Sequence, residues 1–208
     1  MTPLSSQEMR VPSVQARFSC PTFKAASGTH MVAALGPMLA DNAIVTLDAG
    51  TFGAPFYRKI AWKSGQRLLA PISGAMGYGM PAAVAAALRC PDRPVICALG
   101  DGGFLMTGGE LAVAVGRGAP IKVLLSENGS YASIRIHQER AHPGRVSGTD
   151  LINPDLAAIG AAYGYPVMVV REEADLPALL AALVAPGPLF ALVQSSLSAV
   201  LPQPQRAE

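Results

Sequence analysis

The stretch Val95-Ile96-Cys97-Ala98-Leu99-Gly100-Asp101-Gly102-Gly103 decides how this chain folds. Its first five residues are apolar and predict a buried strand over Val95–Leu99. The glycines that follow allow a tight turn. In a parallel α/β sheet such a turn leads into a helix whose first N–H groups are free to bind an anion. The stretch therefore predicts a strand-to-helix turn suited to a phosphate group.

Apolar runs and helical patterns alternate along the rest of the chain. Further buried strands are predicted at Ala43–Leu47, Ile121–Leu125, Val167–Val170 and Leu189–Val193. Helical patterns cover Gly28–Leu39, Pro81–Arg89, Gly109–Val115, Pro154–Tyr163 and Leu176–Val184. The alternation predicts an α/β fold, with a doubly wound, mainly parallel sheet that carries helices on both faces.

The length of 208 residues, half of them apolar, predicts a single domain with a substantial core. Residues 1–28 contain prolines and serines without clear periodicity, so we expect a poorly ordered N-terminal segment. The predicted domain covers residues 29–200, and residues 201–208 form a flexible tail.

The composition argues against several classes of protein. The 16 basic and 14 acidic residues are scattered and give a net charge of +2, so no nucleic acid partner is expected. The longest apolar stretch, Ala75–Leu88, is too short to span a membrane and contains Pro81. Cys20, Cys90 and Cys97 form no CxxC pair, which argues against zinc or a disulfide framework. Polar residues near the start leave no export signal, so we expect a cytoplasmic protein.

The glycine-rich turn places a carboxylate, Asp101, among Gly100, Gly102 and Gly103. A carboxylate would repel a phosphate unless a divalent cation lay between them, and Mg²⁺ prefers such oxygen ligands. Asn128 follows Asp101 by 27 positions. This interval accommodates one helix and one strand, so both side chains should reach neighbouring strand ends. Taken singly, each turn could instead be only a helix cap or a tight turn.

Together these turns resemble the signature of the thiamine-diphosphate enzyme superfamily. The match is to the C-terminal diphosphate-binding domain of its acetolactate-synthase-like branch. The resemblance implies that Asp101, the Asn128 side chain and the main-chain carbonyl of Ser130 hold Mg²⁺ against the diphosphate of thiamine diphosphate. The glycines around Asp101 would then lie against that diphosphate. One departure is that Glu127 stands where the family has the first of two asparagines.

Other segments extend the resemblance. The segment Ser73–Ala83 is similar to the one that contacts the cofactor rings, which implies that the Gly74 carbonyl binds the aminopyrimidine and that Met76 separates the rings. A helix of small residues packed on the sheet is the alternative for part of this segment. Gly50, after the first strand, and Tyr131, after the asparagine turn, are assigned to the same cofactor site.

The segment after the asparagine turn offers candidates for catalysis. Pyruvate-decarboxylase-like relatives would carry a catalytic glutamate at the position of Ile134, and its absence argues against a simple 2-keto acid decarboxylase. His137 is the candidate proton shuttle, with a solvated helix residue as the alternative. Arg135, Arg140 and Arg145 could bind a substrate carboxylate or form an exposed charged face.

The superfamily takes its activating glutamate from a separate pyrimidine-binding domain, for which a chain of this length has no room. We therefore expect the diphosphate- and magnesium-binding half of a 2-keto acid decarboxylase or carboligase. It would be inactive without a pyrimidine-binding domain or subunit, part of a homo- or hetero-oligomer, and free of flavin. The alternatives are a truncated or degenerate domain without turnover, and an unrelated nucleotide-binding protein. The second lacks support because GxGxxG and GKS/T loops are absent.

Overall fold

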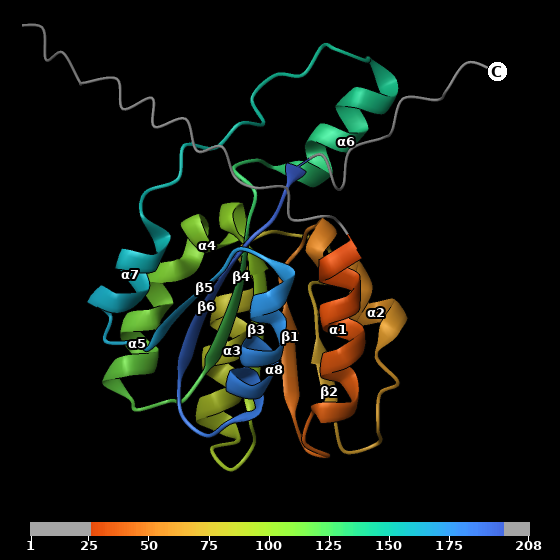
Figure 1. Ribbon diagram of the computed structural model, residues 1–208. Helices are drawn as coiled ribbons and strands as arrows, with labels where there is room; N and C mark the ends of the chain where they lie inside the picture. Colours follow the sequence, from red (N-terminus) through yellow and green to blue (C-terminus); the bar gives the residue numbers. More distant parts are fainter. Residues whose placement is uncertain (1–25, 198–208) are drawn as a thin grey trace, which may run out of the picture.

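Six parallel strands form the centre of the structure, a computed structural model that describes residues 26–197 (Figure 1). Their spatial order is β2-β1-β3-β4-β6-β5, which is a doubly wound sheet as the sequence predicted. The strands are β1 Ile44–Leu47, β2 Arg67–Leu69, β3 Val95–Gly100, β4 Lys122–Glu127, β5 Val167–Val170 and β6 Leu189–Gln194. The predicted flexible tail, and the predicted N-terminal segment up to residue 25, lie outside the described residues.

The apolar runs become strands because the centre of the sheet is covered on both faces. The four central strands are buried along most of their length, while the edge strands β2 and β5 are more exposed. In the centre, β3 aligns Cys97 with Thr46 of β1 and with Val123 of β4. A strand with neighbours on both sides and helices on both faces has no solvated side, so it needs a continuous apolar run.

Two layers of helices cover the sheet (Figure 1). One layer consists of α1 Ala26–Met38, α2 Ala54–Lys59 and α8 Leu176–Val184. The other consists of α3 Gly79–Arg89, α4 Asp101–Thr107, α5 Leu111–Gly116 and α7 Leu156–Ala162. Helix α6 Ala132–Ala141 belongs to neither layer and lies beyond the carboxyl edge of the sheet. Short 3₁₀ helices cover Thr51–Gly53, Gly108–Glu110 and Glu173–Asp175.

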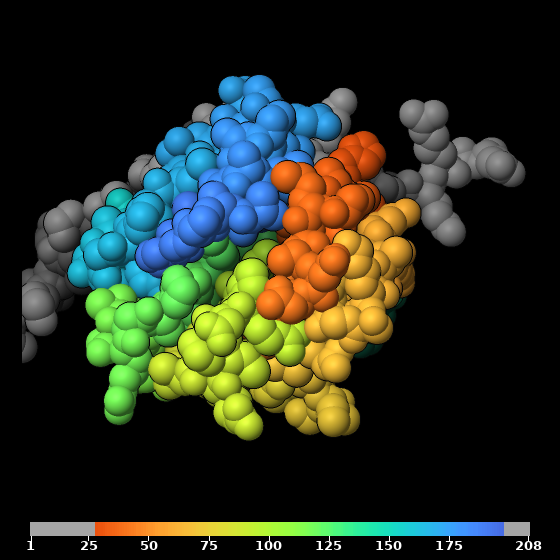
Figure 2. Space-filling model, turned by 90° about the horizontal axis from the view of Figure 1, so that it is seen from below, coloured from red at the N-terminus to blue at the C-terminus, as the bar shows by residue number. Residues whose placement is uncertain are grey.

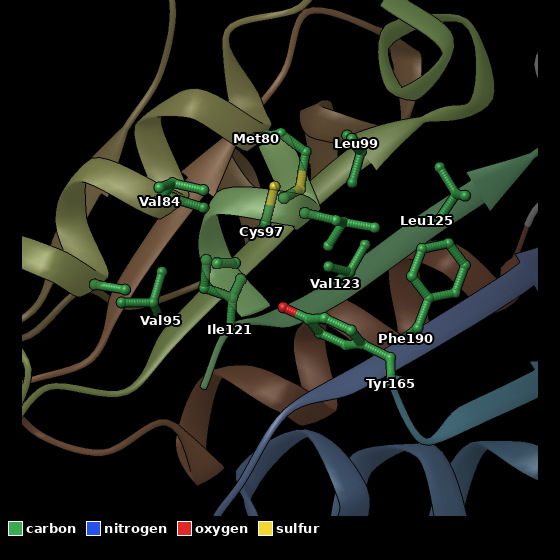
Figure 3. Close-up of a cluster of buried hydrophobic side chains, with 14 of the residues drawn as sticks. Met80, Val84, Val95, Cys97, Leu99, Ile121, Val123, Leu125, Tyr165 and Phe190 are labelled. Carbon is green, nitrogen blue, oxygen red and sulfur yellow. The ribbon is translucent and has the colours of Figure 1, made fainter. Parts of the chain in front are cut away.

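Each helical layer encloses its own apolar core. Viewed from below, α1 lies beside α8 over the first core (Figure 2). In the second core, Met80 from α3 packs over Cys97 and Leu99 of β3 (Figure 3). Phe104 and Phe190 meet there edge to face, with ring centroids 5.5 Å apart. The two cores stabilise the sheet, so functional residues are expected in the loops at its edge.

All five predicted strands are present, but one strand and three α-helices were missed, besides short 3₁₀ helices. Strand β2 has three residues and a partly exposed pattern, too short to produce a periodic signal. Helix α4 begins at Asp101, and the two glycines that follow have low helix propensity. The remaining two are α2, which has a proline in its first turn, and α6, which is mostly polar. Helix α1 begins at Ala26, two residues before the predicted start.

The strand order locates the natural ligand site of this fold. From β1 the chain crosses to β2 on one side, and β3 lies on the other, so the order reverses between β1 and β3. Ligands of open parallel sheets bind beyond the carboxyl ends of strands at such a reversal. None of the helices within residues 26–197 is long and apolar enough to cross a membrane.

Candidate functional site

Asp101 lies at the reversal point, where β3 ends and α4 begins, and only 2% of its surface is exposed. Its Oδ2 accepts three hydrogen bonds: from the backbone N–H of Asn128 at 3.0 Å, from that of Gly129 at 2.7 Å and from the Asn153 side chain at 2.9 Å. Its Oδ1 accepts one, from the Gly102 N–H at 3.0 Å. Oδ2 is therefore saturated, while Oδ1 retains capacity for a further partner.

The turn after β4 wraps around this carboxylate, so the structure brings Asp101 and Asn128 together as the spacing predicted. Gly129 has a φ of 66°, the left-handed region that favours glycine. The Asn128 side-chain oxygen accepts the N–H of Ser130 at 3.0 Å. The Ser130 hydroxyl donates to the Thr149 carbonyl at 2.8 Å. These bonds fix the turn against a neighbouring loop and hold its polar groups at the sheet edge.

A small hollow of about 30 Å³ lies at this edge. Nine of the ten residues predicted for the cofactor line it: Gly50, Met76, Gly100, Asp101, Gly102, Gly103, Asn128, Ser130 and Tyr131. A Cβ at Gly102 would stand 2.6 Å from the Tyr131 ring and 3.0 Å from the Met76 methyl group. Glycine fits there without displacing the two side chains that close over the backbone.

The structure leaves the other predicted residues outside the hollow. Gly74 lies in an exposed part of its loop with a φ of 69°. His137 is exposed on α6 and lines neither this hollow nor the larger cavity described below. Ile134, on the same helix, is 48% exposed, and Arg135 pairs with Asp150. The roles of Gly74 and His137 stay predictions.

Asp48 is a residue at this edge to which the sequence analysis gave no role. It follows β1, is 3% exposed, and accepts the N–H of Ala49 at 2.7 Å through Oδ1. It also accepts the N–H of Gly77 at 3.0 Å and of Tyr78 at 3.3 Å, and so ties the Met76 loop to the end of β1. Its signal was an aspartate directly after a predicted strand.

Asn153 is the second such residue. Its side-chain amide donates to Asp101 Oδ2 at 2.9 Å and to Glu127 Oε1 at 3.3 Å. It comes from the segment before α7, to which no role was assigned from the sequence. Nothing in the sequence indicated that this segment returns to the end of β3, because a distance of 52 positions carries no local signal.

A larger cavity of about 460 Å³ lies between α1, α2 and the ends of β3, β4 and β6. It shares Thr51, Phe52 and Asn128 with the hollow, but its other lining is mostly apolar. Only Asn128 among the predicted cofactor residues reaches it. The residues predicted for the cofactor therefore gather at the smaller hollow.

The donor set at the hollow fits a hard cation better than a soft one. No group of three or more His, Cys, Asp or Glu side chains suited to a metal occurs within the described residues. The available ligands are instead one Asp101 carboxylate oxygen, the Asn128 amide oxygen and main-chain carbonyls, all hard oxygen donors. Magnesium accepts such a set when phosphate oxygens and water complete its octahedron.

A carboxylate and a glycine-lined hollow at the reversal point of a parallel sheet define a class of α/β proteins that bind phosphorylated ligands at strand ends. Comparison with known families identifies the group within this class. Residues 48–194 match the family "Thiamine pyrophosphate enzyme, C-terminal TPP binding domain". The chain belongs to this family, which confirms the resemblance found in the sequence.

Curated relatives include full-length enzymes. The chain is 36% identical over 158 residues to the acetolactate synthase large subunit of Parasynechococcus marenigrum, covering 72% of this chain and 25% of that protein. It is 31% identical over 199 residues to the acetolactate synthase isozyme 1 large subunit of Escherichia coli, covering 89% of this chain and 34% of that protein. A probable 2-ketoarginine decarboxylase of Pseudomonas aeruginosa is 41% identical over 107 residues, covering 51% of this chain and 18% of that protein. The chain thus spans no more than about a third of these relatives.

Proposed function

We propose that this chain is the diphosphate- and magnesium-binding part of a thiamine-diphosphate-dependent 2-keto acid decarboxylase or carboligase. The observation that carries the proposal is the arrangement of Asp101, whose Oδ2 is saturated by the asparagine turn while Oδ1 retains capacity for a ligand. The family supports thiamine diphosphate as the ligand. The names of two relatives, an acetolactate synthase and a 2-ketoarginine decarboxylase, support a 2-keto acid as the substrate class.

Magnesium would be held by Asp101 Oδ1, the Asn128 side-chain oxygen and the Ser130 carbonyl. The Asn128 oxygen already accepts the Ser130 N–H, and the Ser130 carbonyl accepts the Ala132 N–H at 2.8 Å. Each of these oxygens has a second lone pair, so both hydrogen bonds are compatible with coordination. The cation would neutralise the repulsion between Asp101 and a diphosphate.

Bound thiamine diphosphate would supply the carbanion chemistry, and the residues of this chain would bind and orient it. Gly102 leaves room for close approach of the backbone, and Met76 and Tyr131 close over that position. The Met76 loop is held by hydrogen bonds from Gly77 and Tyr78 to Asp48. Contacts of this kind would hold the cofactor in a fixed position before the substrate arrives.

A partner surface is part of the proposal. A hollow of about 30 Å³ is far too small to enclose the cofactor, so the cofactor's rings would need cover from another protein surface. We assign that cover to a pyrimidine-binding domain or subunit that supplies the activating glutamate. The chain's coverage of no more than about a third of its relatives is consistent with a missing domain. Alone, the chain would bind cofactor but lack turnover.

A non-catalytic binding domain is the second candidate. It is favoured by the exposed positions of His137 and Ile134, neither of which lines the hollow. The two candidates differ in whether addition of a pyrimidine-binding protein produces turnover of a 2-keto acid such as pyruvate.

The test is calorimetric titration of the chain with thiamine diphosphate, with and without Mg²⁺, for the wild type and Asp101→Asn. The wild type should bind in a magnesium-dependent manner. In the variant the amide oxygen can replace Oδ2, which puts an NH₂ group where the cation needs an oxygen, and binding should weaken at least about 100-fold. The control is Asp92→Asn on the exposed surface. Magnesium-independent binding, or equal binding by Asp101→Asn, would contradict the proposal.

A further inference from the structure

We infer that Asn153 is a positioning residue of the proposed magnesium site and that Glu127 holds it in place, an inference that rests on the proposed function. The Asn153 amide nitrogen lies 2.9 Å from Asp101 Oδ2 and 3.3 Å from Glu127 Oε1. One NH₂ group therefore joins carboxylates from the ends of β3 and β4. Neither of these contacts follows from the signature that the sequence shares with the family.

The two carboxylates determine how the Asn153 amide is oriented. If the amide were turned over, its oxygen would face two carboxylate oxygens, which is repulsive and removes the donor that Asp101 Oδ2 and Glu127 Oε1 share. In the observed orientation Asn153 Oδ1 is buried and has no hydrogen-bond partner among the described residues. Buried acceptors are ordinarily satisfied, and a cation with bound water beside Asp101 would provide a donor.

The same amide assigns different tasks to the two oxygens of Asp101. Asn153 is the third donor at Oδ2, after the N–H groups of Asn128 and Gly129. With Oδ2 saturated, Oδ1 is the oxygen that can bind a cation. Removal of the Asn153 donor would leave only the backbone N–H groups of Asn128 and Gly129 on Oδ2, so the carboxylate could rotate more easily and bind a cation less selectively. Partners of metal-binding side chains affect metal affinity in this way.

Glu127 is itself held by the neighbouring strand. Its Oε2 accepts the Gln194 side-chain amide at 3.3 Å, and its carbonyl accepts the Ser195 N–H at 2.8 Å. A series of side chains thus runs from Gln194 through Glu127 and Asn153 to Asp101. Asparagine, the residue that the family resemblance leads one to expect at 127, is one methylene shorter and would not span this gap from the same backbone position. Glu127 therefore holds Asn153 in this chain, a role that is not apparent from the replacement of the family's asparagine by glutamate.

The test measures cation binding without thiamine. Mn²⁺ serves as the probe, with inorganic pyrophosphate in place of the cofactor's diphosphate, and bound Mn²⁺ is followed by electron paramagnetic resonance on the full chain. Asn153→Ala should weaken Mn²⁺ binding about twentyfold, within the range known for such outer partners. Glu127→Ala should weaken it about tenfold, whereas Glu127→Gln keeps an oxygen for Asn153 and should stay within about threefold. Asn42→Ala, an exposed asparagine, is the matched control.

Coupling between the two residues separates positioning from a general loss of structure. If Glu127 acts through Asn153, Glu127→Ala should have no further effect on Mn²⁺ binding in the Asn153→Ala background. The melting temperatures of the cation-free variants show whether each one folds. If Asn153→Ala does not fold, the contrast between Glu127→Ala and Glu127→Gln provides the test.

Four outcomes would overturn the inference. Two concern Asn153: Mn²⁺ binding by Asn153→Ala that equals the wild type, and effects of the two substitutions that multiply in the double variant. The others are equal losses of Mn²⁺ binding for Glu127→Ala and Glu127→Gln, and a wild type that does not bind Mn²⁺ with pyrophosphate. The last would also count against the proposed function. Binding of Mn²⁺ and pyrophosphate that depends on Asn153, without binding of thiamine diphosphate, would retain the positioned cation site and reject the cofactor. Normal cofactor binding with no effect of Asn153→Ala would reject the inference alone.

Discussion

Two buried aspartates at neighbouring strand ends have different surroundings. Asp48 follows β1 and uses both carboxylate oxygens for backbone N–H groups, two of which belong to the distant loop at Gly77 and Tyr78. Asp101 follows β3 and accepts three hydrogen bonds at Oδ2 but only one at Oδ1. Both residues are at most 3% exposed, so burial alone does not distinguish them.

The packing around each carboxylate distinguishes the two aspartates. Asp48 accepts two hydrogen bonds at Oδ1 and one at Oδ2, joins two loops, and has Gly79 and Gly103 packed directly against it. Asp101 faces the hollow lined by Met76 and Tyr131. Since the strand ends are equivalent in the fold, the neighbouring loops determine which aspartate faces the hollow, where we propose that the cation binds.

The largest effect should come from Asp48→Asn. Whichever way the amide is turned, an NH₂ group faces a backbone N–H, and the link to Gly77 or Tyr78 is lost in a buried site. The free energy of unfolding should fall by about 3 kcal/mol, measured by urea denaturation. Asp101→Asn should lose about 1 kcal/mol, because its Oδ1 bond to Gly102 is local. Equal losses of stability would break the comparison.

Gly103→Ala should have the next largest effect, because a Cβ at this position would overlap Asp48 Oδ2. We expect a loss of about 2 kcal/mol in the free energy of unfolding. Gly109→Ala is the matched control, since nothing lies within 4 Å of its Cβ position. A Gly103→Ala variant as stable as Gly109→Ala would show that Asp48 can move.

Gly102→Ala addresses the Asp101 side of the comparison. Its Cβ would press on Tyr131 at 2.6 Å and Met76 at 3.0 Å, and both are side chains at the hollow that can shift. We expect about 1 kcal/mol less stability but about tenfold weaker binding of Mg²⁺ and pyrophosphate by calorimetry. Weaker binding with nearly normal stability would mark a ligand-binding position, whereas the opposite pattern would assign Gly102 to the structural side.

The smallest effect concerns pH. Cys97 is buried among apolar side chains (Figure 3). Its pKa is raised to about 12, mainly by this burial, with a lowering contribution from the Thr46 hydrogen bond and a raising contribution from the charge of Asp48. A thiol with a raised folded-state pKa stabilises fully below its unfolded pKa, and stability is lost as pH rises from about 9 towards 12. Between pH 8 and pH 9.5 the loss should be about 0.8 kcal/mol by urea denaturation.

A cysteine variant isolates this contribution. Cys97→Ala should remove the corresponding slope of stability against pH. Tyr165→Phe is the second variant to compare, because burial also raises the pKa of Tyr165 to about 12 and its hydroxyl has no partner among the described residues. The Tyr165 contribution should begin about one pH unit higher, near the ordinary pKa of tyrosine. A slope that persists in Cys97→Ala would contradict the assignment.

Much of the fold was predictable because its central strands have no polar face. Runs such as Val95–Leu99 are long and wholly apolar, so they indicated buried strands without any alignment. The meeting of Asp101 and Asn128 was also predictable, because one helix and one strand between them bring parallel strand ends together. The short edge strand β2 and the glycine-rich start of α4 gave no such signal.

The sequence by itself determined the parallel α/β architecture and the edge at which the candidate site lies, together with the residue types proposed to bind a diphosphate there. Apolar runs and glycine turns are local patterns, and local patterns follow directly from burial and backbone geometry. Only the tertiary structure decided that Asp48 joins two loops and that Asn153 connects Asp101 to Glu127. Those contacts join residues from about 26 to 52 positions apart through single hydrogen bonds, so they depend on how the loops pack after the sheet has formed.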